Sequence, residues 1–221
     1  AGASEYFVVE ACEYRRSFLN MWPTILVITN IEEDHLDYYA DLADIQDAFR
    51  TLAHRVPHNG YIICRPSHPN VRPVIEGVKA TVVDYETSVD ADLTLTVPGV
   101  HNMENAHAAA TVALVCGLPR EGVAKALASF SGTWRRFEYL GDTHGGVPVY
   151  DDYAHHPTEV AATLAAAREV YPDKRIIAVF EPHLFSRTKK LLTAFAHSFA
   201  DADTVAVAPI YARSEERRVG K

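Results

Sequence analysis

The sequence predicts an α/β protein with largely parallel sheets, divided into two domains. Short apolar runs alternate with longer amphipathic stretches, which is typical of a parallel sheet with connecting helices. Clusters of polar residues follow several of the apolar runs, and the chain of 221 residues is longer than one average domain. Hydrophobic residues make up 48% of the chain and charged residues 23%. This composition is that of a folded protein rather than of a disordered tail.

Apolar runs rich in β-branched and aromatic residues are predicted as strands. These runs are residues 6–9, 24–29, 61–64, 80–83, 147–150, 176–180 and 204–208. A strand–turn–strand begins near Phe137, and the alternating residues of 85–100 predict a hairpin or an edge segment. Because residues 6–9 have the pattern of a buried strand, we expect the chain to begin inside a domain.

Amphipathic stretches predict helices at residues 42–55, 103–115, 120–129, 157–170 and 184–199. In the first of these, Ile45, Phe49 and Leu52 have helical spacing and mark one buried face. Pro157 suits the first position of a helix, where the missing N–H costs nothing.

The segment Ser131-Gly132-Thr133 is the predicted domain boundary, because it separates an alanine-rich helix from a new strand–turn–strand. We therefore expect domains at residues 1–132 and 133–212, with a hinge near Gly132. Residues 213–221 lack apolar periodicity and switch to net positive charge. They resemble the read-through translation of a sequencing adapter, so we expect a non-native tail.

The charge balance and the cysteines exclude several classes of protein. Lys and Arg number 21 and Asp and Glu 29, a net charge of −8, which argues against a nucleic-acid or anionic-membrane surface. Cys12, Cys64 and Cys116 lie far apart without CxxC spacing, so neither a disulfide framework nor a cysteine zinc site is predicted. No apolar run approaches the length of a membrane span. These observations predict a cytoplasmic protein.

The first polar cluster, residues 29–37, follows a predicted strand, where α/β proteins bind ligands. Its carboxylates and His35 could hold a divalent cation. Glu10, expected at the end of a neighbouring strand, would emerge at the same edge. The alternative is a solvated acidic turn in which Asp34 caps a helix.

The second cluster is Gly99 to Ala106, where Asn102 and Asn105 share a helix face at positions i and i+3. An asparagine both donates and accepts hydrogen bonds, which suits the edge of a nucleobase such as adenine. The alternative is that Asn102 only caps the helix.

Two more clusters also join a strand end to a helix start. In the third, Asp152 could hold ribose hydroxyls, and His155 and His156 could meet an anion at the helix N-terminus. Paired histidines also suit zinc, but further ligands at the usual spacing are absent. In the fourth, His183 and Arg187 lie at i and i+4 and could clamp a carboxylate, or only cap a surface helix.

The order of these motifs resembles that of the Mur ligases, and most of all the branch that adds L-alanine to UDP-N-acetylmuramate. The resemblance runs from about Phe7 to Ala212. Its motifs are Val9-Glu10-Ala11-Cys12-Glu13, Thr29-Asn30-Ile31-Glu32 with Asp34-His35, His101-Asn102 with Asn105-Ala106, Arg135-Arg136-Phe137-Glu138, Asp152 through Pro157, and Pro182-His183 through Arg187-Thr188. It implies the latter part of a parallel-sheet central ATPase domain, followed by most of a Rossmann-like C-terminal domain.

The resemblance also implies cofactors and substrates, namely ATP, Mg2+, UDP-N-acetylmuramate and L-alanine. The implied metal ligands are Glu10 and His35, and the implied nucleotide contacts are Asn102, Asn105, Arg136 and Asp152. His155, His183 and Arg187 would receive the incoming alanine and an acyl-phosphate. Cations between carboxylate and γ-phosphate fit this chemistry, since two anions must approach each other. His155 is our hypothesis for the base that deprotonates the alanine ammonium group.

Four departures from the family pattern bear on this interpretation. No GxxxxGK[ST] phosphate loop occurs in residues 1–221, so we expect it upstream and expect this chain to be inactive alone. The first lysine is Lys79, so the carbamylated lysine of other Mur ligases is absent, which favours the alanine branch. Leu184 replaces an arginine of some members, and Cys12 replaces a common aspartate.

Three alternatives stay open at this point. The nearest is a recycling ligase that joins a tripeptide to UDP-N-acetylmuramate, which would differ around residues 153–156 and 183–187. A second is a metal-dependent hydrolase built on Asp34, His35, His155 and His156. A third is a non-catalytic nucleotide-binding module.

Overall fold

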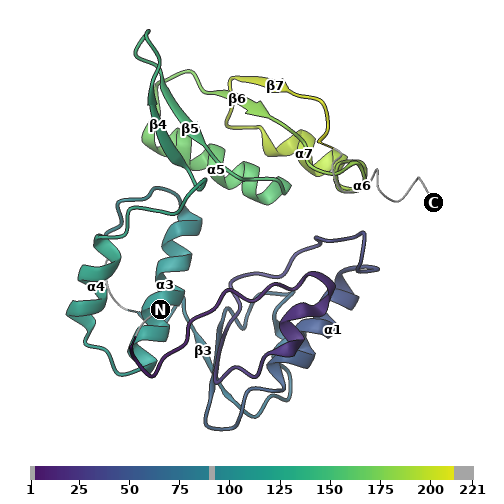
Figure 1. The fold of residues 1–221 in the computed structure, drawn as a ribbon, viewed down its shortest axis with the longest axis vertical. Helices are drawn as coiled ribbons and strands as arrows, with labels where there is room; N and C mark the ends of the chain where they lie inside the picture. The colour runs from purple at the N-terminus through teal and green to yellow at the C-terminus, as the bar shows by residue number, and fades with distance from the viewer. Residues whose placement is uncertain (1–2, 90–92, 212–221) are drawn as a thin grey trace. The chain divides into compact units, whose positions relative to one another are not determined.

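The structure is a computed structural model that describes residues 3–89 and 93–211 (Figure 1). The chain divides into two compact units, Ala1–Asp84 and Tyr85–Lys221, called here the first and second units. None of the helices in the described ranges has the length and hydropathy that crossing a bilayer requires.

The first unit is built on a parallel sheet. Its strands are β1 (Ile25–Val27), β2 (Tyr61–Cys64) and β3 (Thr81–Asp84), in the order β1-β2-β3. The helices are a 3-10 helix, η1 (Tyr14–Asn20), and the α-helices α1 (Leu42–Ala53) and α2 (Arg72–Ile75). Asp41 caps α1, because its side chain accepts a hydrogen bond from the Asp44 N–H at 2.9 Å.

The core of the first unit lies between this sheet and the helices. Ile45, Ala48 and Leu52 form the buried face of α1, as their helical spacing predicts. They join Ile62 of β2 and Val74 of α2 in one apolar cluster. Each of the Ile, Leu and Val side chains contributes roughly 1.5–3 kcal/mol when fully buried, so this cluster fixes the sheet whose ends carry the first polar cluster.

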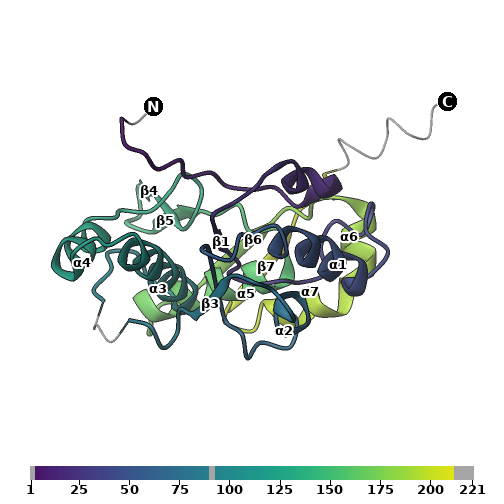
Figure 2. The same ribbon diagram turned by 90° about the horizontal axis from the view of Figure 1, so that it is seen from below.

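The second unit contains a helix pair and a strand–helix region. The pair is α3 (Val100–Val115) and α4 (Arg120–Ala128), which contact each other and lie side by side in Figures 1 and 2. Strands β4 (Glu138–Asp142) and β5 (Pro148–Asp151) form an antiparallel hairpin. Strands β6 (Ile177–Phe180) and β7 (Thr204–Val207) are parallel. The remaining helices are α5 (Pro157–Val170), α6 (Phe185–Lys190) and α7 (Leu192–Ser198).

Helix α5 is the central helix of the second unit. Its Val160 and Leu164 pack with Phe180 of β6 and Phe195 of α7 in an apolar cluster. Contacts also join α5 to α3. Because α5 begins directly after the loop that follows β5, its position fixes the residues at its N-terminus. Those residues include the third polar cluster.

Most predicted helices and strands are confirmed, and their observed ends lie within three residues of the predicted ones. Residues 61–64 and 157–170 agree with the structure at both ends, and Pro157 is at the start of α5. The predicted helix at 184–199 is wrong in its continuity, because it divides at Leu191 into α6 and α7. Leu191 has φ −104° and ψ 18°, which takes the backbone out of the α-helical region.

The predicted strand at residues 6–9 is wrong. Within the described residues this segment forms no strand, and Phe7 and Val8 are 88% and 91% exposed. A strand forms only when a neighbour pairs with it, and the described sheet of the first unit consists of β1, β2 and β3. Glu10 therefore does not end a strand in this structure.

Two further predictions differ from the structure or fall outside it. The hairpin or edge segment at 85–100 is wrong for residues 85–89 and 93–100, which contain no strand; residues 90–92 lie outside the described ranges. The proposed tail, residues 213–221, also lies outside them. Two short helices, η1 and α2, were not predicted, because seven- and four-residue elements show too little periodicity.

Candidate functional site

His35 lies in the first unit, in the loop that follows β1. Its Nε2 atom is 2.9 Å from Oε1 of Glu13 and 3.8 Å from Oδ2 of Asp34. The Tyr14 ring lies against the imidazole, with centroids 4.9 Å apart. The backbone of His35 is left-handed, with φ of 53°, a conformation that is uncommon for a non-glycine residue. The loop thus presents the imidazole to two carboxylates.

Glu13 is held as an ionised group by this arrangement. The hydrogen bond from His35 is the largest influence that lowers its pKa, and it outweighs the raising effect of burial. The Glu13 main chain is also tied down, because its carbonyl accepts a hydrogen bond from the Tyr39 hydroxyl at 2.5 Å. The sequence motif contained Glu13, but our interpretation assigned it no role.

The predicted metal ligands are not assembled into a complete site. Glu10 is exposed and lies three residues before Glu13. Among the described residues, no three His, Cys, Asp or Glu side chains converge as a metal-binding group. Asp34 accepts a hydrogen bond from the His35 N–H at 2.7 Å and does not precede a helix, so the alternative of a helix cap at Asp34 is wrong. Glu10 and His35 stay predictions as metal ligands.

The second predicted cluster forms the N-terminus of α3 in the second unit. The helix begins at Val100, and Gly99 is its N-cap with φ of 98°, a conformation that favours glycine. Asn102 therefore is not the cap; its Nδ2 donates a hydrogen bond to the Pro98 carbonyl at 2.6 Å. Asn105 is exposed one turn further along the same face.

His101 connects this helix with the hairpin region electrostatically. Burial lowers its pKa most strongly, and the positive charge of Arg136 lowers it further, while Asp152 and Glu104 oppose these effects. Arg136 and Asp152 therefore lie within electrostatic reach of the start of α3. Two predicted nucleotide contacts, Arg136 and Asp152, are thus close to α3, which carries the other two contacts.

Arg136 lies in a tight turn before β4. The residues on either side of it, Arg135 and Phe137, are left-handed with φ of 54° and 49°. This costs about 1–2 kcal/mol per residue, so the turn must be held from outside. The Tyr153 N–H donates to the Arg135 carbonyl at 2.8 Å, and the Phe137 N–H donates to Asp152 at 2.7 Å.

Asp152 holds main-chain groups with both carboxylate oxygens. Oδ2 accepts the bond from Phe137, and Oδ1 accepts one from the Ala154 N–H at 2.7 Å. Asp152 thereby ties the end of β5 to the turn that presents Arg136. A carboxylate offers about four acceptor sites, so two are still available for the hydroxyls of a ribose.

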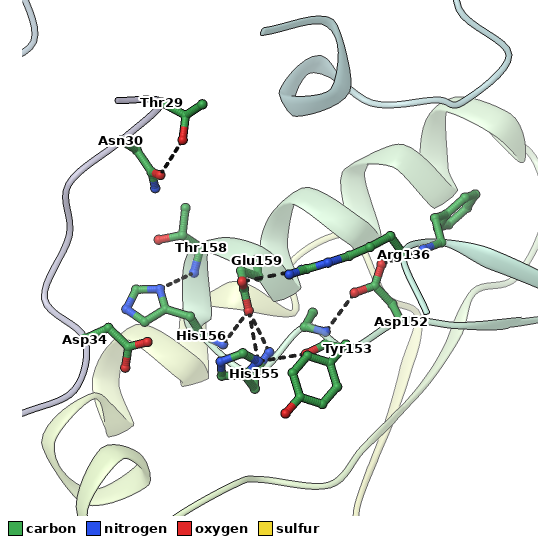
Figure 3. A network of polar contacts seen from close by, with 12 residues as sticks. Thr29, Asn30, Asp34, Arg136, Asp152, Tyr153, His155, His156, Thr158 and Glu159 are labelled. Atoms are coloured by element: carbon green, nitrogen blue, oxygen red, sulfur yellow. Dashed lines mark hydrogen bonds and ion pairs between the residues drawn. The ribbon is translucent and has the colours of Figure 1, made fainter. Parts of the chain in front are cut away.

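Glu159 of α5 contacts both Arg136 and His155, as Figure 3 shows. Its Oε1 atom is 3.5 Å from Nη1 of Arg136, and its Oε2 atom is 3.4 Å from Nδ1 of His155. Oε2 also accepts hydrogen bonds from the N–H groups of His155, at 2.9 Å, and His156, at 3.2 Å. Burial acts to raise the pKa of Glu159, but these hydrogen bonds and the electrostatic effects of His155 and Arg136 together lower it.

His155 is oriented through one of its two ring nitrogens. Nδ1 lies 2.8 Å from the Tyr153 carbonyl, which can only accept, so Nδ1 carries the proton. In the neutral ring the lone pair is then on Nε2. This is the tautomer that a general base acting through Nε2 requires.

His183 and Arg187 lie at the fourth cluster, after β6. Leu184, with φ of 72°, is the N-cap of α6, and Arg187 is only 8% exposed. The His183 ring stacks on Tyr211 with centroids 5.2 Å apart. Burial, Arg187 and His155 all lower the pKa of His183, whereas Glu181 raises it. His183 is thus within electrostatic reach of the other two predicted catalytic residues.

The structure therefore brings together most predicted site residues of the second unit. Arg136, Asp152 and His155 form one network, and His183 and Arg187 adjoin it through His155. Glu159 was missed, although the sequence contains a signal for it. It lies three residues after His156 and completes a capping box at the start of α5.

Comparisons with known proteins define the class of this chain. Residues 1–93 match the Mur ligase middle domain, and residues 135–219 match the Mur ligase glutamate ligase domain. The chain therefore belongs to the Mur ligase family.

Individual relatives make the likeness more specific. The chain is 41% identical to a UDP-N-acetylmuramate–L-alanine ligase of Caldanaerobacter subterraneus subsp. tengcongensis, over 97% of the chain and 52% of that protein. It is 42% identical to a ligase of the same name from Desulfitobacterium hafniense, over 98% of the chain and 53% of that protein. The crystal structure of a UDP-N-acetylmuramate–alanine ligase from Thermotoga maritima has a TM-score of 0.67 at 25% identity, covering 89% of this chain and 48% of that one. The chain spans about half the length of these relatives.

Proposed function

We propose that this chain is part of an ATP-dependent ligase that joins L-alanine to the lactyl carboxylate of UDP-N-acetylmuramate through an acyl-phosphate. The observation that carries the proposal is the identity of 41–42% with ligases of that name, over 97% or more of the chain. The reaction belongs to peptidoglycan synthesis, and we assign it to the cytoplasm, where ATP and UDP-sugars are available.

We assign the chain to two ligase domains. Residues 1–132 would form the C-terminal part of the central ATP-binding domain, and residues 133–212 the C-terminal domain. The family matches support this division, since one ends at residue 93 and the other begins at residue 135. Gly132, with φ of 96°, lies between the two matched segments.

The donors around His35 suit a divalent cation in their chemistry. His35 is accompanied by the carboxylates of Glu13 and Asp34, and oxygen ligands are those that Mg2+ prefers. We propose Glu10 and His35 as the residues that hold Mg2+. When bound, the ion neutralises charge on the phosphates of ATP and on the attacking carboxylate.

We assign the nucleotide to the second unit. Asn102 and Asn105 would hold the adenine edge, and Asp152 would bind ribose hydroxyls with its remaining acceptor sites. Arg136 would place its guanidinium against the phosphates, to which a planar fork of donors is well suited. The electrostatic coupling of His101 to Arg136 and Asp152 supports this grouping.

We assign amide formation to His155, His183 and Arg187. Nε2 of His155 takes one proton from the alanine ammonium group, which produces a neutral amine. The amine nitrogen then attacks the acyl carbon to form the C–N bond, and the C–O bond to phosphate breaks with its electron pair leaving on the phosphate. The second N–H proton leaves with that phosphate. His183 and Arg187 would face the oxyanion that develops in the tetrahedral intermediate.

A chimera tests this function. The upstream half of the Caldanaerobacter ligase is placed before residue 1, and its downstream end is placed after residue 212. We expect ADP release and an amide product that require both UDP-N-acetylmuramate and L-alanine. Activity with a tripeptide in place of alanine would instead indicate the recycling ligase. ATP binding without product from either substrate would contradict both ligase functions.

A further inference from the structure

Glu159 is the side chain that links the predicted nucleotide contact to the predicted base. One carboxylate oxygen faces Nη1 of Arg136, and the other faces Nδ1 of His155 (Figure 3). We propose that Glu159 is a positioning residue that fixes the Arg136 guanidinium and the His155 imidazole in the site. This inference rests on the proposed function for the roles of those two residues, but the link itself can be tested without it.

The carboxylate is well placed for such a role, because the main chain holds it. The N–H groups of His155 and His156 both donate to Oε2, so Glu159 keeps its position before any ligand arrives. It is also anchored in α5, whose Val160 is next in sequence and is buried in the apolar core. A group fixed in this way loses little side-chain entropy when it orients a second side chain.

The consequences for the two partners differ. For His155, Glu159 and the Tyr153 carbonyl both lie at Nδ1 and favour the tautomer with its lone pair on Nε2. A negative charge beside Nδ1 also stabilises the imidazolium that forms when His155 takes a proton. For Arg136, the carboxylate gives the guanidinium a partner 3.5 Å away, beside the turn that Asp152 holds.

The simpler explanation is that Glu159 only caps α5. It occupies position N3 of a capping box, in which its carboxylate accepts the N-cap N–H. The variant Glu159→Gln distinguishes the two explanations, because each predicts a different behaviour for it. The amide oxygen can still accept both main-chain N–H groups, but the charge is lost and the NH2 group takes the place of an acceptor beside Arg136. A pure cap therefore predicts near wild-type behaviour, and a positioning role predicts a large loss.

The first test uses residues 1–221 alone and follows the Glu159 carboxyl carbon by NMR during a pH titration. We expect a pKa below the ordinary value in the wild type, and an upward shift in both Arg136→Gln and His155→Ala. Lys189→Gln, which removes an exposed cation from α6, is the matched control and should leave the pKa of Glu159 unchanged. No shift in either test variant would overturn the proposal.

The second test uses the chimera. Glu159→Gln should lower kcat for amide formation about 10- to 100-fold and raise the KM for ATP, while the thermal midpoint stays near that of the wild type. In an Arg136→Gln background, Glu159→Gln should have no further effect on the KM for ATP. Glu159→Asp, which restores the charge, should recover part of the loss. A Glu159→Gln chimera as active as the wild type would refute the positioning role, whereas an inactive wild-type chimera would count only against the proposed function.

Discussion

In each unit a histidine is paired with a glutamate, and the two pairs use opposite sides of the imidazole. In the first unit, Glu13 faces Nε2 of His35 at 2.9 Å. In the second unit, Glu159 faces Nδ1 of His155 at 3.4 Å, together with the Tyr153 carbonyl. The glutamate thus contacts Nε2 in the first pair and Nδ1 in the second.

The two glutamates are also held differently. The hydrogen bond from His35 is the main cause of the lowered pKa of Glu13. Burial is the largest single influence on the pKa of Glu159 and raises it, but the N–H groups of His155 and His156 and the electrostatic effects of His155 and Arg136 together lower it. Glu13 therefore depends on its histidine, whereas Glu159 is fixed independently and can orient its histidine.

The largest expected effect is on activity, and it distinguishes His35 from His155 by the reaction step that each variant impairs. In the chimera, His155→Ala should lower amide formation about 10²- to 10⁴-fold, because the general base is lost. Phosphate transfer to UDP-N-acetylmuramate should be largely unchanged, because it precedes the attack of the amine. His35→Ala should lower both steps. ADP release with and without alanine measures them separately, and an equal loss of both steps in His155→Ala would disprove its assignment as the base.

The next effect tests which glutamate of the first unit holds a metal with His35. Mn2+ is titrated into residues 1–221 and followed by electron paramagnetic resonance. Glu10→Gln should abolish binding, because it removes a proposed ligand. Glu13→Gln should weaken binding only about 10- to 100-fold, because it changes a neighbour of His35 but removes no proposed ligand. Glu5→Gln is the control and should bind as the wild type does. A greater loss in Glu13→Gln than in Glu10→Gln would make Glu13 the ligand.

The comparison also shows what the sequence can predict. Elements with a strong periodic pattern and their own core, such as β2 and α5, follow from sequence because local pattern and burial agree. The segment at residues 6–9 has an equally strong apolar pattern but forms no strand. Strand formation depends on a pairing partner, and the sequence of the segment does not specify that partner.

The residues of the candidate site also differ in how far the sequence predicts them. His155, His183 and Arg187 could be proposed from the sequence because their residue types and motif order are distinctive. Glu159 was missed because its spacing from His156 also has a purely structural meaning as a helix cap. The pairing of His35 with Glu13 was missed because it depends on the left-handed backbone at His35, which no periodicity encodes.

A smaller effect concerns the contribution of Glu159 to folding. Glu159→Ala removes the acceptor of two main-chain N–H groups at the start of α5 and should cost about 1–2 kcal/mol of the free energy of unfolding. Glu159→Gln should cost less than half of that, since the amide oxygen replaces the acceptor. Urea denaturation of residues 1–221 provides the measurement. Equal losses in both variants would show that the charge, and not the cap, dominates the stability.

The smallest effect is the pH dependence of that stability. The pKa of Glu159 in the folded protein is below its ordinary value of 4.5, so its ionisation stabilises the fold above that value. The contribution is lost as the pH falls through the lowered pKa. The stability difference between wild type and Glu159→Gln should therefore be constant near neutral pH, shrink below about pH 4.5 and vanish under more acidic conditions. Leu164→Ala, which removes apolar contacts only, should differ from wild type by the same amount at every pH. Urea unfolding between about pH 3 and pH 7 measures both stability differences. If the difference between wild type and Glu159→Gln does not change over this range, the native contacts of the Glu159 carboxylate do not favour its charged form.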